Sequence, residues 1–367
     1  MASAPSGARA GPPLQRERAI RLLIVDDSAV VRAVFSRMLQ PHEQFHIAAM
    51  LPDAAGALDF LVDHRVDVIL LDIEMPGMDG LTALPRLIAA SHGARVLVVS
   101  SAAEAGAVAT LKALALGAAD TLAKPGAEAF RGRFADTLAE RLLRLGRADS
   151  VVAPTGAEPN PVESWGSGPA LRPSSVEPVC CLAVGASTGG IHALADLFRT
   201  MPATFDAPIL ITQHLPANFM GFFASQVAAM AGRPTEVAQD GMRLRNGAIL
   251  IAPGDAHLGL AGRGDRVIVS LGHQPSVSGC MPSVDPMLES VAEAYGAGGL
   301  AIILSGMGRD GQDGATRLAA AGGTILAQDQ ASSVVWGMPG AVARAGLCSA
   351  ILPPALLGAR VQRRGRA

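Results

Sequence analysis

Apolar runs that end in polar side chains recur along this chain, and they constrain its fold more than any other feature. One such run ends in Asp26 and Asp27, and another ends in Asp72. Continuous apolar runs are typical of strands buried on both faces of a parallel sheet, and segments with helical spacing separate them here. Five strand–helix units between residues 19 and 145 therefore predict a (βα)5 domain of the doubly wound α/β class.

The same pattern returns in the second half of the chain. Residues 179–355 predict a second doubly wound α/β domain with a mostly parallel sheet. Residues 146–178 are rich in Pro, Gly and Ser, which indicates an interdomain linker. Residues 1–18 have no apolar segment of the kind found in secretory signals and are expected to be a disordered leader. Residues 356–367 are expected to be a basic, frayed tail.

Composition narrows the classes of function. The net charge is −2 over 367 residues, so nothing in the whole-chain charge indicates nucleic acid as a partner. The chain has four cysteines without a CxxC pair, which argues against a disulfide framework or a zinc site and fits a reducing cytoplasm. Its apolar runs are shorter than the roughly 18 residues of a membrane span, so we expect no direct membrane insertion.

Three carboxylates end two strands of the first predicted sheet. Open parallel sheets bind ligands at the carboxyl ends of their strands, so Asp26, Asp27 and Asp72 are expected to lie together and to hold Mg²⁺. A cation there would let Asp72 accept a phosphoryl group, because it neutralises the transferring oxygens. Ser100 and Lys124 follow two further strands and are placed to contact that group. The alternative is that the acids cap helices and Lys124 is a surface charge.

A hydroxyl, an imidazole and a carboxylate end three strands of the second predicted sheet. Ser187, His214 and Asp310 are therefore expected to converge at one sheet edge. A serine needs an adjacent base to become a nucleophile, and a carboxylate fixes the tautomer of that base. The glycines around Ser187 permit a tight turn, and the helix that follows would stabilise developing negative charge. His192 and His257 are rival candidates for the base.

Two other classes of function stay open on these residues alone. GASTGG is compatible with a dinucleotide-binding turn, which would make the protein a nucleotide-binding oxidoreductase with a fused regulatory domain. The glycine spacing differs from GxGxxG, however, and the next strand ends in Gln213 and His214 instead of an acid. The second alternative is a non-catalytic signalling adaptor whose two domains only bind partners.

Residues 20–145 resemble a response-regulator receiver domain through VDDS, LDIEMPGMDG, VVSS and KP. The resemblance implies phosphorylation of Asp72 by a histidine kinase, a switch through Ser100 and Lys124, and a trans-to-cis change before Pro125. It also implies a Mg²⁺ site formed by Asp26, Asp27, Asp72 and a backbone carbonyl near Glu74. Thr121 departs from the family, because receivers usually carry an aromatic switch residue at that position.

Residues 179–353 resemble the catalytic domain of chemotaxis protein-glutamate methylesterases. The segments that carry the resemblance are VGASTGG, ITQHLPANF, IAPGDAHLGL, PSVDPML, ILSGMGRDG and AQDQASSVVWGMPGAV. It implies that Ser187 is the nucleophile, His214 the base and Asp310 the third triad member. The backbone amides of Thr188 and Met307 are then expected to form the oxyanion hole. Met281 departs from the family, which commonly has Arg there.

Together the resemblances imply a phosphorylation-regulated serine hydrolase. It would demethylate glutamate γ-methyl esters and deamidate glutamines on the cytoplasmic domain of chemoreceptors, with no cofactor for the esterase reaction. Its partners would be the methylated receptor and a chemotaxis histidine kinase. The unphosphorylated receiver is expected to cover the catalytic cleft, and phosphorylation of Asp72 to shift the packing of the domains toward an open form.

Overall fold

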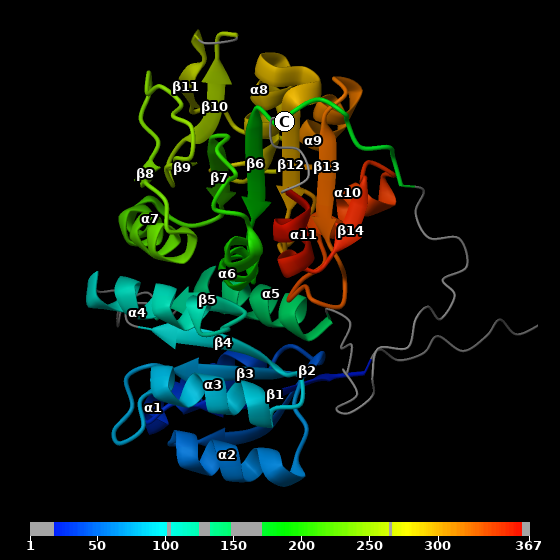
Figure 1. The fold of residues 1–367 in the computed structure, drawn as a ribbon. Coiled ribbons are helices and arrows are strands. Elements are labelled where there is room, and N and C mark those ends of the chain that lie inside the picture. The colour runs from blue at the N-terminus through cyan, green and yellow to red at the C-terminus, as the bar shows by residue number, and fades with distance from the viewer. Residues whose placement is uncertain (1–17, 101–103, 125–132, 148–170, 264–265, 362–367) are drawn as a thin grey trace, which may run out of the picture.

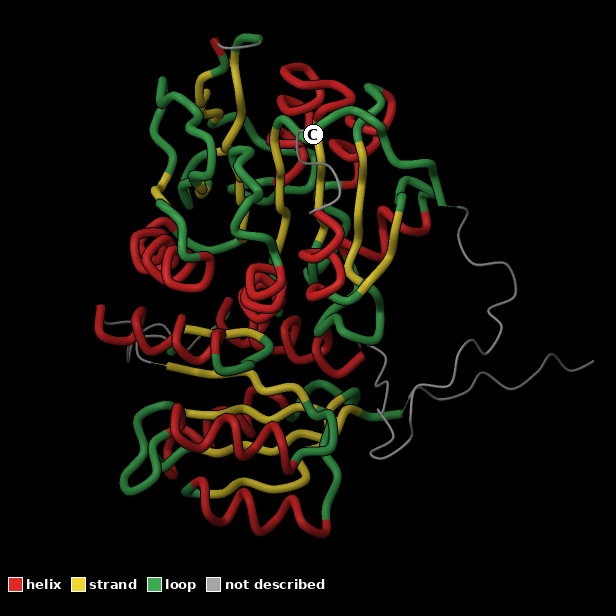
Figure 2. The backbone as a smooth tube through the Cα atoms, viewed as in Figure 1, coloured by secondary structure: helices red, strands yellow, loops and turns green. Residues whose placement is uncertain are grey.

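The computed structural model describes residues 18–100, 104–124, 133–147, 171–263 and 266–361. They form two α/β domains that pack directly against each other (Figure 1). Helices cover both faces of each sheet, as the backbone tube shows (Figure 2). No helix in these described ranges is long and apolar enough to cross a membrane.

The N-terminal domain is built on a five-stranded parallel sheet in the order β2-β1-β3-β4-β5. Its strands are β1 (Ile20–Val25), β2 (Phe45–Leu51), β3 (Val68–Asp72), β4 (Arg95–Ser100) and β5 (Asp120–Ala123). Its helices are α1 (Ala29–Leu39), α2 (Ala54–Asp63), α3 (Gly80–Ala90), α4 (Glu104–Ala115) and α5 (Arg133–Arg147). The predicted (βα)5 fold is confirmed.

The apolar runs explain this sheet. Every residue of β3 is buried, as a strand covered by helices on both faces requires. The helix N-termini follow their capping signals, since the Ser28 hydroxyl accepts a hydrogen bond from the Val31 amide and Asp53 and Asp79 cap the next two helices in the same way. These caps fix where the loops at the carboxyl ends of the strands turn into helices.

The C-terminal domain has a seven-stranded parallel sheet in the order β14-β13-β12-β6-β7-β9-β8, and a separate antiparallel hairpin of β10 and β11. Its strands are β6 (Cys181–Ala186), β7 (Ile209–Gln213), β8 (Thr235–Val237), β9 (Ile249–Ile251), β10 (His257–Ala261), β11 (Ile268–Gly272), β12 (Gly299–Ile303), β13 (Thr324–Gln328) and β14 (Ala350–Leu352). Its helices are α6 (Gly190–Thr200), α7 (Ala217–Ala231), α8 (Val284–Tyr295), the short 3-10 helix η2 (Gly296–Gly298), α9 (Gln312–Ala320), α10 (Met338–Arg344) and α11 (Pro354–Val361). The predicted doubly wound, mostly parallel architecture is confirmed.

The expected boundary at residue 355 is wrong, because α11 continues the catalytic domain to residue 361. Leu357 and Val361 are buried, and the helix packs on α6 so closely that a Cβ on Gly358 would lie 2.2 Å from the Leu197 carbonyl oxygen. The basic residues of this segment had suggested a frayed tail, but its buried apolar residues hold the helix against the domain. The expected leader and most of the expected linker lie outside the described residues.

The domains meet through α4, β5 and α5 of the first domain and α6 and α7 of the second (Figure 1). Arg95 extends this contact, since its Nε donates a hydrogen bond to the Val334 carbonyl oxygen at 2.9 Å and its Nη1 bonds the Leu145 carbonyl oxygen at 3.0 Å. Val335 packs into the apolar cluster that includes Leu138, Leu142 and Leu145. The carboxyl edge of the second sheet therefore faces the first domain.

Candidate active site

Three neighbouring strands bring Ser187, His214 and Asp310 to one edge of the second sheet. The loops that carry them follow β6, β7 and β12, and β6 pairs with the other two strands in parallel. The backbone amide of His214 donates to the Ala186 carbonyl oxygen at 3.2 Å, which places the base beside the residue that precedes the serine. The three loops therefore leave the sheet at the same edge, as expected from the strand ends.

The imidazole and the carboxylate form a hydrogen-bonded pair. His214 Nε2 lies 2.7 Å from Asp310 Oδ2. Asp310 is 2 % exposed, and it also accepts hydrogen bonds from the Ser283 hydroxyl at 2.6 Å and from the Val284 amide at 2.8 Å. Burial alone would raise the pKa of Asp310, but the hydrogen bonds and the charge of His214 hold it well below its usual range. Asp310 is thus an anion fixed in one orientation.

The serine does not complete this chain of hydrogen bonds. Within the described residues the Ser187 hydroxyl makes no hydrogen bond to His214, although a serine nucleophile needs its base within hydrogen-bond reach. Cys280 contacts the imidazole and takes part in its electrostatics. Burial lowers the pKa of His214, but Asp310 and Cys280 outweigh that effect and raise it to about 9. Catalytic hydrogen bonds often tighten only when substrate is present.

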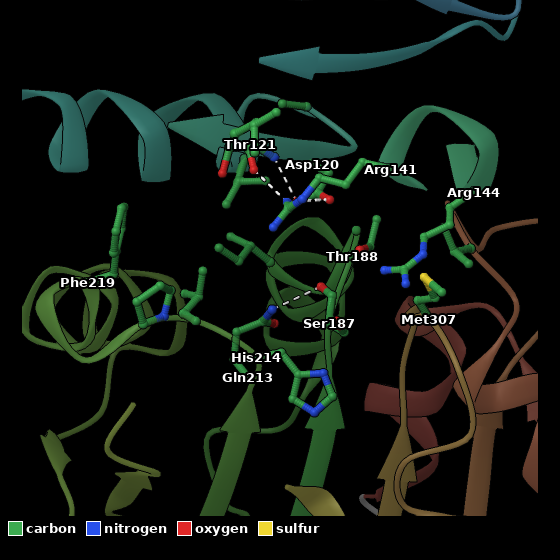
Figure 3. Close-up of a pocket in the computed structure, with 18 of the residues that line it drawn as sticks. Asp120, Thr121, Arg141, Arg144, Ser187, Thr188, Gln213, His214, Phe219 and Met307 are labelled. Atoms are coloured by element: carbon green, nitrogen blue, oxygen red, sulfur yellow. Dashed lines mark hydrogen bonds and ion pairs between the residues drawn. The ribbon is translucent and has the colours of Figure 1, made fainter. Parts of the chain in front are cut away.

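A tight turn positions the serine. Gly189 has φ +77°, in the left-handed region, and α6 begins directly after it. The Ser187 carbonyl oxygen accepts hydrogen bonds from the Gly190 amide at 2.8 Å and from Gln213 Nε2 at 2.9 Å (Figure 3). Gln213 is 3 % exposed and was missed as a functional residue by the sequence analysis. The sequence feature that could have identified Gln213 is a polar residue at the end of the apolar run ILIT, directly before His214.

Two backbone amides are available for an oxyanion. In the described part of the chain, the N–H groups of Thr188 and Met307 donate to no acceptor. Both residues line the cavity that contains Ser187 and His214. Free donors beside a nucleophile stabilise the negative oxygen of a tetrahedral intermediate.

Neither rival histidine is placed as the base. His257 is 3 % exposed, and its Nδ1 accepts a hydrogen bond from the Ser283 amide at 2.9 Å, so its Nε2 carries the proton and donates to the Gln274 carbonyl oxygen at 2.8 Å. His192 lies on the exposed side of α6, 3.9 Å from Asp196. His257 instead supports the Ser283 segment that holds Asp310.

The acids of the first domain also meet as expected. One carboxylate oxygen from each of Asp26, Asp27 and Asp72 lies within 4.8 Å of the others. Lys124 Nζ pairs with Asp26 Oδ2 at 2.9 Å and with Asp72 Oδ2 at 2.7 Å. Burial is the largest effect on Asp72 and raises its pKa, with Asp26 adding to the shift and Lys124 opposing it. Hard cations bind such oxygen clusters, so the three residues fit a Mg²⁺ site.

The other residues predicted for the receiver site lie around this cluster or outside the described residues. Glu74 is exposed beyond Asp72, and its backbone donates a hydrogen bond to the Asp72 carboxylate. The side chain of Ser100 and all of Pro125 lie outside what the structure describes. Thr121 faces the other domain, and its carbonyl oxygen accepts a hydrogen bond from Arg141 Nη1 at 2.6 Å.

A cavity of about 660 Å³ lies between the two domains. The first domain contributes Asp120, Arg141 and Arg144, and the second contributes Ser187, His214 and Met307. In Figure 3 the Arg144 side chain extends toward Met307, and Arg141 lies above Ser187. Arg141 Nη1 pairs with Asp120 Oδ2 at 2.7 Å. The triad residues therefore open into a space whose other wall belongs to the first domain.

Comparison with known proteins matches both halves of the chain. Residues 22–130 match the response regulator receiver domain family, and residues 182–361 match the CheB methylesterase family. A protein of Caulobacter vibrioides named protein-glutamate methylesterase/protein-glutamine glutaminase 2 is 44% identical, over 95% of this chain and 99% of that protein. A protein of Paramagnetospirillum magneticum with the same name, numbered 1, is 42% identical, over 91% of this chain and 93% of its own length.

Proposed function

Because this chain belongs to the family of CheB methylesterases that carry a receiver domain, we propose that it hydrolyses glutamate γ-methyl esters on the cytoplasmic domain of chemoreceptors. Glutamines of the same receptors would be deamidated at the same site. The prediction of an ester hydrolase joined to a response-regulator receiver is confirmed by this membership. The observation that carries the proposal is the His214–Asp310 pair beside Ser187 at a cavity with two free amides.

The geometry supports a defined role for each group. The Ser187 hydroxyl attacks the ester carbonyl while His214 accepts its proton, and the Asp310 anion stabilises the imidazolium that results. The amides of Thr188 and Met307 bind the oxyanion. His214 then protonates the leaving methanol, or ammonia from a glutamine, and the Ser187 acyl ester remains. A water that gives its proton to His214 hydrolyses this ester and restores the serine.

Methanol release tests the function directly. The purified chain is incubated with a methyl-esterified receptor cytoplasmic fragment, and methanol is quantified while mass spectrometry follows the modified side chains. We expect methanol to appear with free glutamate, and glutamines to gain the mass of deamidation. A nucleotide cofactor retained on purification, with no methanol formed, would instead support the oxidoreductase. Partner binding without any turnover would support the adaptor.

We also propose that a chemotaxis histidine kinase phosphorylates Asp72, with Mg²⁺ held by Asp26, Asp27, Asp72 and a backbone group near Glu74. A bound Mg²⁺ supplies positive charge that neutralises the transferring phosphoryl oxygens. Lys124 already pairs with Asp26 and Asp72, and it would bind the oxygens of an aspartyl phosphate. Ser100, which follows β4, completes the proposed switch. A cytoplasmic location is part of the proposal, because the receptor domain and the kinase that it requires would be found there.

The receiver is proposed to restrict access to the esterase site. The first domain contributes Asp120, Arg141 and Arg144 to the cavity that contains Ser187, so a receptor helix is expected to compete with these residues for the site. The arrangement is held partly by the Arg95–Val334 hydrogen bond. Phosphorylation of Asp72 would favour an arrangement in which these contacts separate, and it can do so only through different stability of the two arrangements.

The Asp72→Asn variant is expected to lose labelling by a small phosphodonor such as acetyl phosphate, because an amide cannot accept the phosphoryl group. The phosphodonor and Mg²⁺ should also stimulate methanol release by the wild type and leave the variant at its basal rate. Asp79→Asn is the matched control, since this exposed acid caps α3 outside the cluster. Labelling that persists in Asp72→Asn would move the phosphoacceptor to another residue.

A further inference from the structure

Cys280 lies beside the catalytic histidine and has no part in the proposed reaction. It is half-buried and lines the cavity between the domains. The loop that carries it is fixed by hydrogen bonds, from the Ser276 hydroxyl to the Cys280 carbonyl oxygen at 2.9 Å and from the Cys280 amide to the Ser278 hydroxyl at 3.3 Å. The Ser278 and Ser283 hydroxyls lie 3.3 Å apart, and Ser283 in turn bonds Asp310. The backbone of Cys280 and the triad carboxylate therefore belong to one hydrogen-bonded network.

Three different kinds of metal ligand converge at this point. One ligand atom from each of His214, Cys280 and Asp310 lies within 4.8 Å of the other two. Imidazole nitrogen, thiolate sulfur and carboxylate oxygen are the three groups that bind zinc in proteins. In a tetrahedral zinc site such atoms lie roughly 3.4 to 3.6 Å apart, as zinc–ligand distances of about 2.0 to 2.3 Å require. The 2.7 Å between His214 Nε2 and Asp310 Oδ2 would have to widen by about 0.7 Å to reach this geometry.

We propose that His214, Cys280 and Asp310 form a binding site for a divalent transition-metal ion of the zinc type, and that the bound ion inhibits hydrolysis. The sequence had argued against zinc because it has no CxxC pair, but these ligands come from three separate segments. Three protein ligands leave the fourth tetrahedral position open to the cavity for water. The binding part of the proposal is independent of the proposed function, whereas the inhibition rests on it.

The choice of ion follows from the ligands. Thiolate and imidazole favour zinc and similar ions over Mg²⁺, which prefers oxygen. On binding, the Cys280 thiol releases a proton, and the His214 imidazolium releases its Nε2 proton and keeps the proton on Nδ1. The Cys280 thiolate and the Asp310 carboxylate are then the two negative ligands that balance the charge of the ion, and the imidazole is neutral. Arg144 is close enough for its pKa to respond to Cys280, and its positive charge opposes the ion. The Asp26 cluster, which offers only oxygen, suits Mg²⁺ better.

The same contacts explain why the ion would inhibit. A metal bound to His214 Nε2 replaces the hydrogen bond from this nitrogen to Asp310. It also leaves the one proton of the neutral ring on Nδ1, so that this nitrogen cannot accept the Ser187 proton. The nucleophile would then lack its base. Inhibition is therefore expected to act mainly on the rate of acylation.

Cobalt provides a readout that does not depend on activity. Co²⁺ bound by a thiolate gives a charge-transfer absorption band in the near ultraviolet, whereas Co²⁺ bound only by oxygen and nitrogen does not. We expect the full-length wild-type chain to show this band and Cys280→Ser to lack it. Cys180→Ser is the matched control, since Cys180 is an exposed free cysteine outside the cavity, and it should keep the band. A wild-type chain without the band would overturn the proposed site.

Zinc inhibition is measured on a small activated ester, with each variant compared to its own rate in a chelator. We expect Zn²⁺ to inhibit the wild type and Cys180→Ser equally, and Cys280→Ser to need at least about tenfold more Zn²⁺, because loss of weaker supporting contacts already costs 10- to 100-fold in metal affinity. Equal sensitivity of Cys280→Ser and the wild type would refute inhibition through this site. If the chain proved inactive on every ester, the cobalt band would still decide whether the site exists.

Discussion

Replacing Ser187 with alanine is expected to lower the rate of methanol release from a methylated receptor by about 10⁴-fold or more. The variant removes the hydroxyl that forms the acyl intermediate. It leaves the His214–Asp310 pair and the free amides of Thr188 and Met307 in place. Loss of a triad nucleophile typically leaves only the small acceleration that comes from binding and the oxyanion hole. Methanol measured over hours by gas chromatography covers this range.

The fold should be unaffected by this change. The Ser187 hydroxyl has no hydrogen-bond partner in the part of the chain that the structure describes, so its loss leaves no buried group unsatisfied. Ser225→Ala is the matched control, because that exposed hydroxyl on α7 only bonds the Gly221 carbonyl oxygen of its own helix. It should retain full activity. If Ser187→Ala, folded by circular dichroism, still released methanol at the wild-type rate, the serine mechanism would be wrong.

Replacing Asp310 with asparagine is expected to lower kcat by about 10⁴-fold, because an amide no longer fixes the tautomer of the base or stabilises the imidazolium. The carboxylate also raises the pKa of His214, which reaches about 9 in the intact site. Wild-type kcat/KM should therefore rise with pH up to about pH 9. In the variant the midpoint should move to lower pH, and the plateau should be far lower.

The pH profile separates a charge effect from simple misfolding. A His214 pKa raised from 6.5 to about 9 stabilises the folded state fully below pH 6.5, and this stabilisation is lost as the pH rises through 9. The lowered pKa of Asp310 adds stability that is fully present above pH 3.8 and is lost as the pH falls further. Asp310→Asn should thus lose stability mainly at mildly acidic and neutral pH. Asp313→Asn, an exposed acid on the same segment, should change neither profile. If the midpoint of the kcat/KM–pH curve were unchanged in Asp310→Asn, a group other than His214 would control that curve. Asp285 would be the next group to test, because burial raises its pKa to about 7.

The positions of the proposed catalytic residues could be predicted because each lies at the end of an apolar strand. Parallel pairing of β12, β6 and β7 then brings Asp310, Ser187 and His214 together with no further information. The receiver acids are predictable for the same reason. In both domains the hydrophobic pattern fixes the strands, and the strands fix the functional edge.

Apart from Gln213, which ends β7, the residues that the sequence analysis missed lie on segments without such a pattern. Cys280 and Ser283 belong to a loop rich in Ser, Gly and Pro, whose path is set by hydrogen bonds to distant groups such as the His257 ring and the Asp310 carboxylate. The absence of a Ser187–His214 hydrogen bond depends on the orientation of one ring, which has no signature in sequence. The end of the domain was misjudged because basic residues mask the two buried apolar positions of α11.

The Gln213 amide has a consequence for motion at the site. Its hydrogen bond to the Ser187 carbonyl oxygen, with the backbone bond between His214 and Ala186, ties the nucleophile and the base to the same two strands. The wall formed by Arg141 and Arg144 belongs to a separate body. The entrance can therefore widen or narrow as the bodies shift, while the backbone of Ser187 and the backbone of His214 keep their relative positions. Movement of the first domain can therefore open or close the entrance without moving the strands that carry the proposed nucleophile and base.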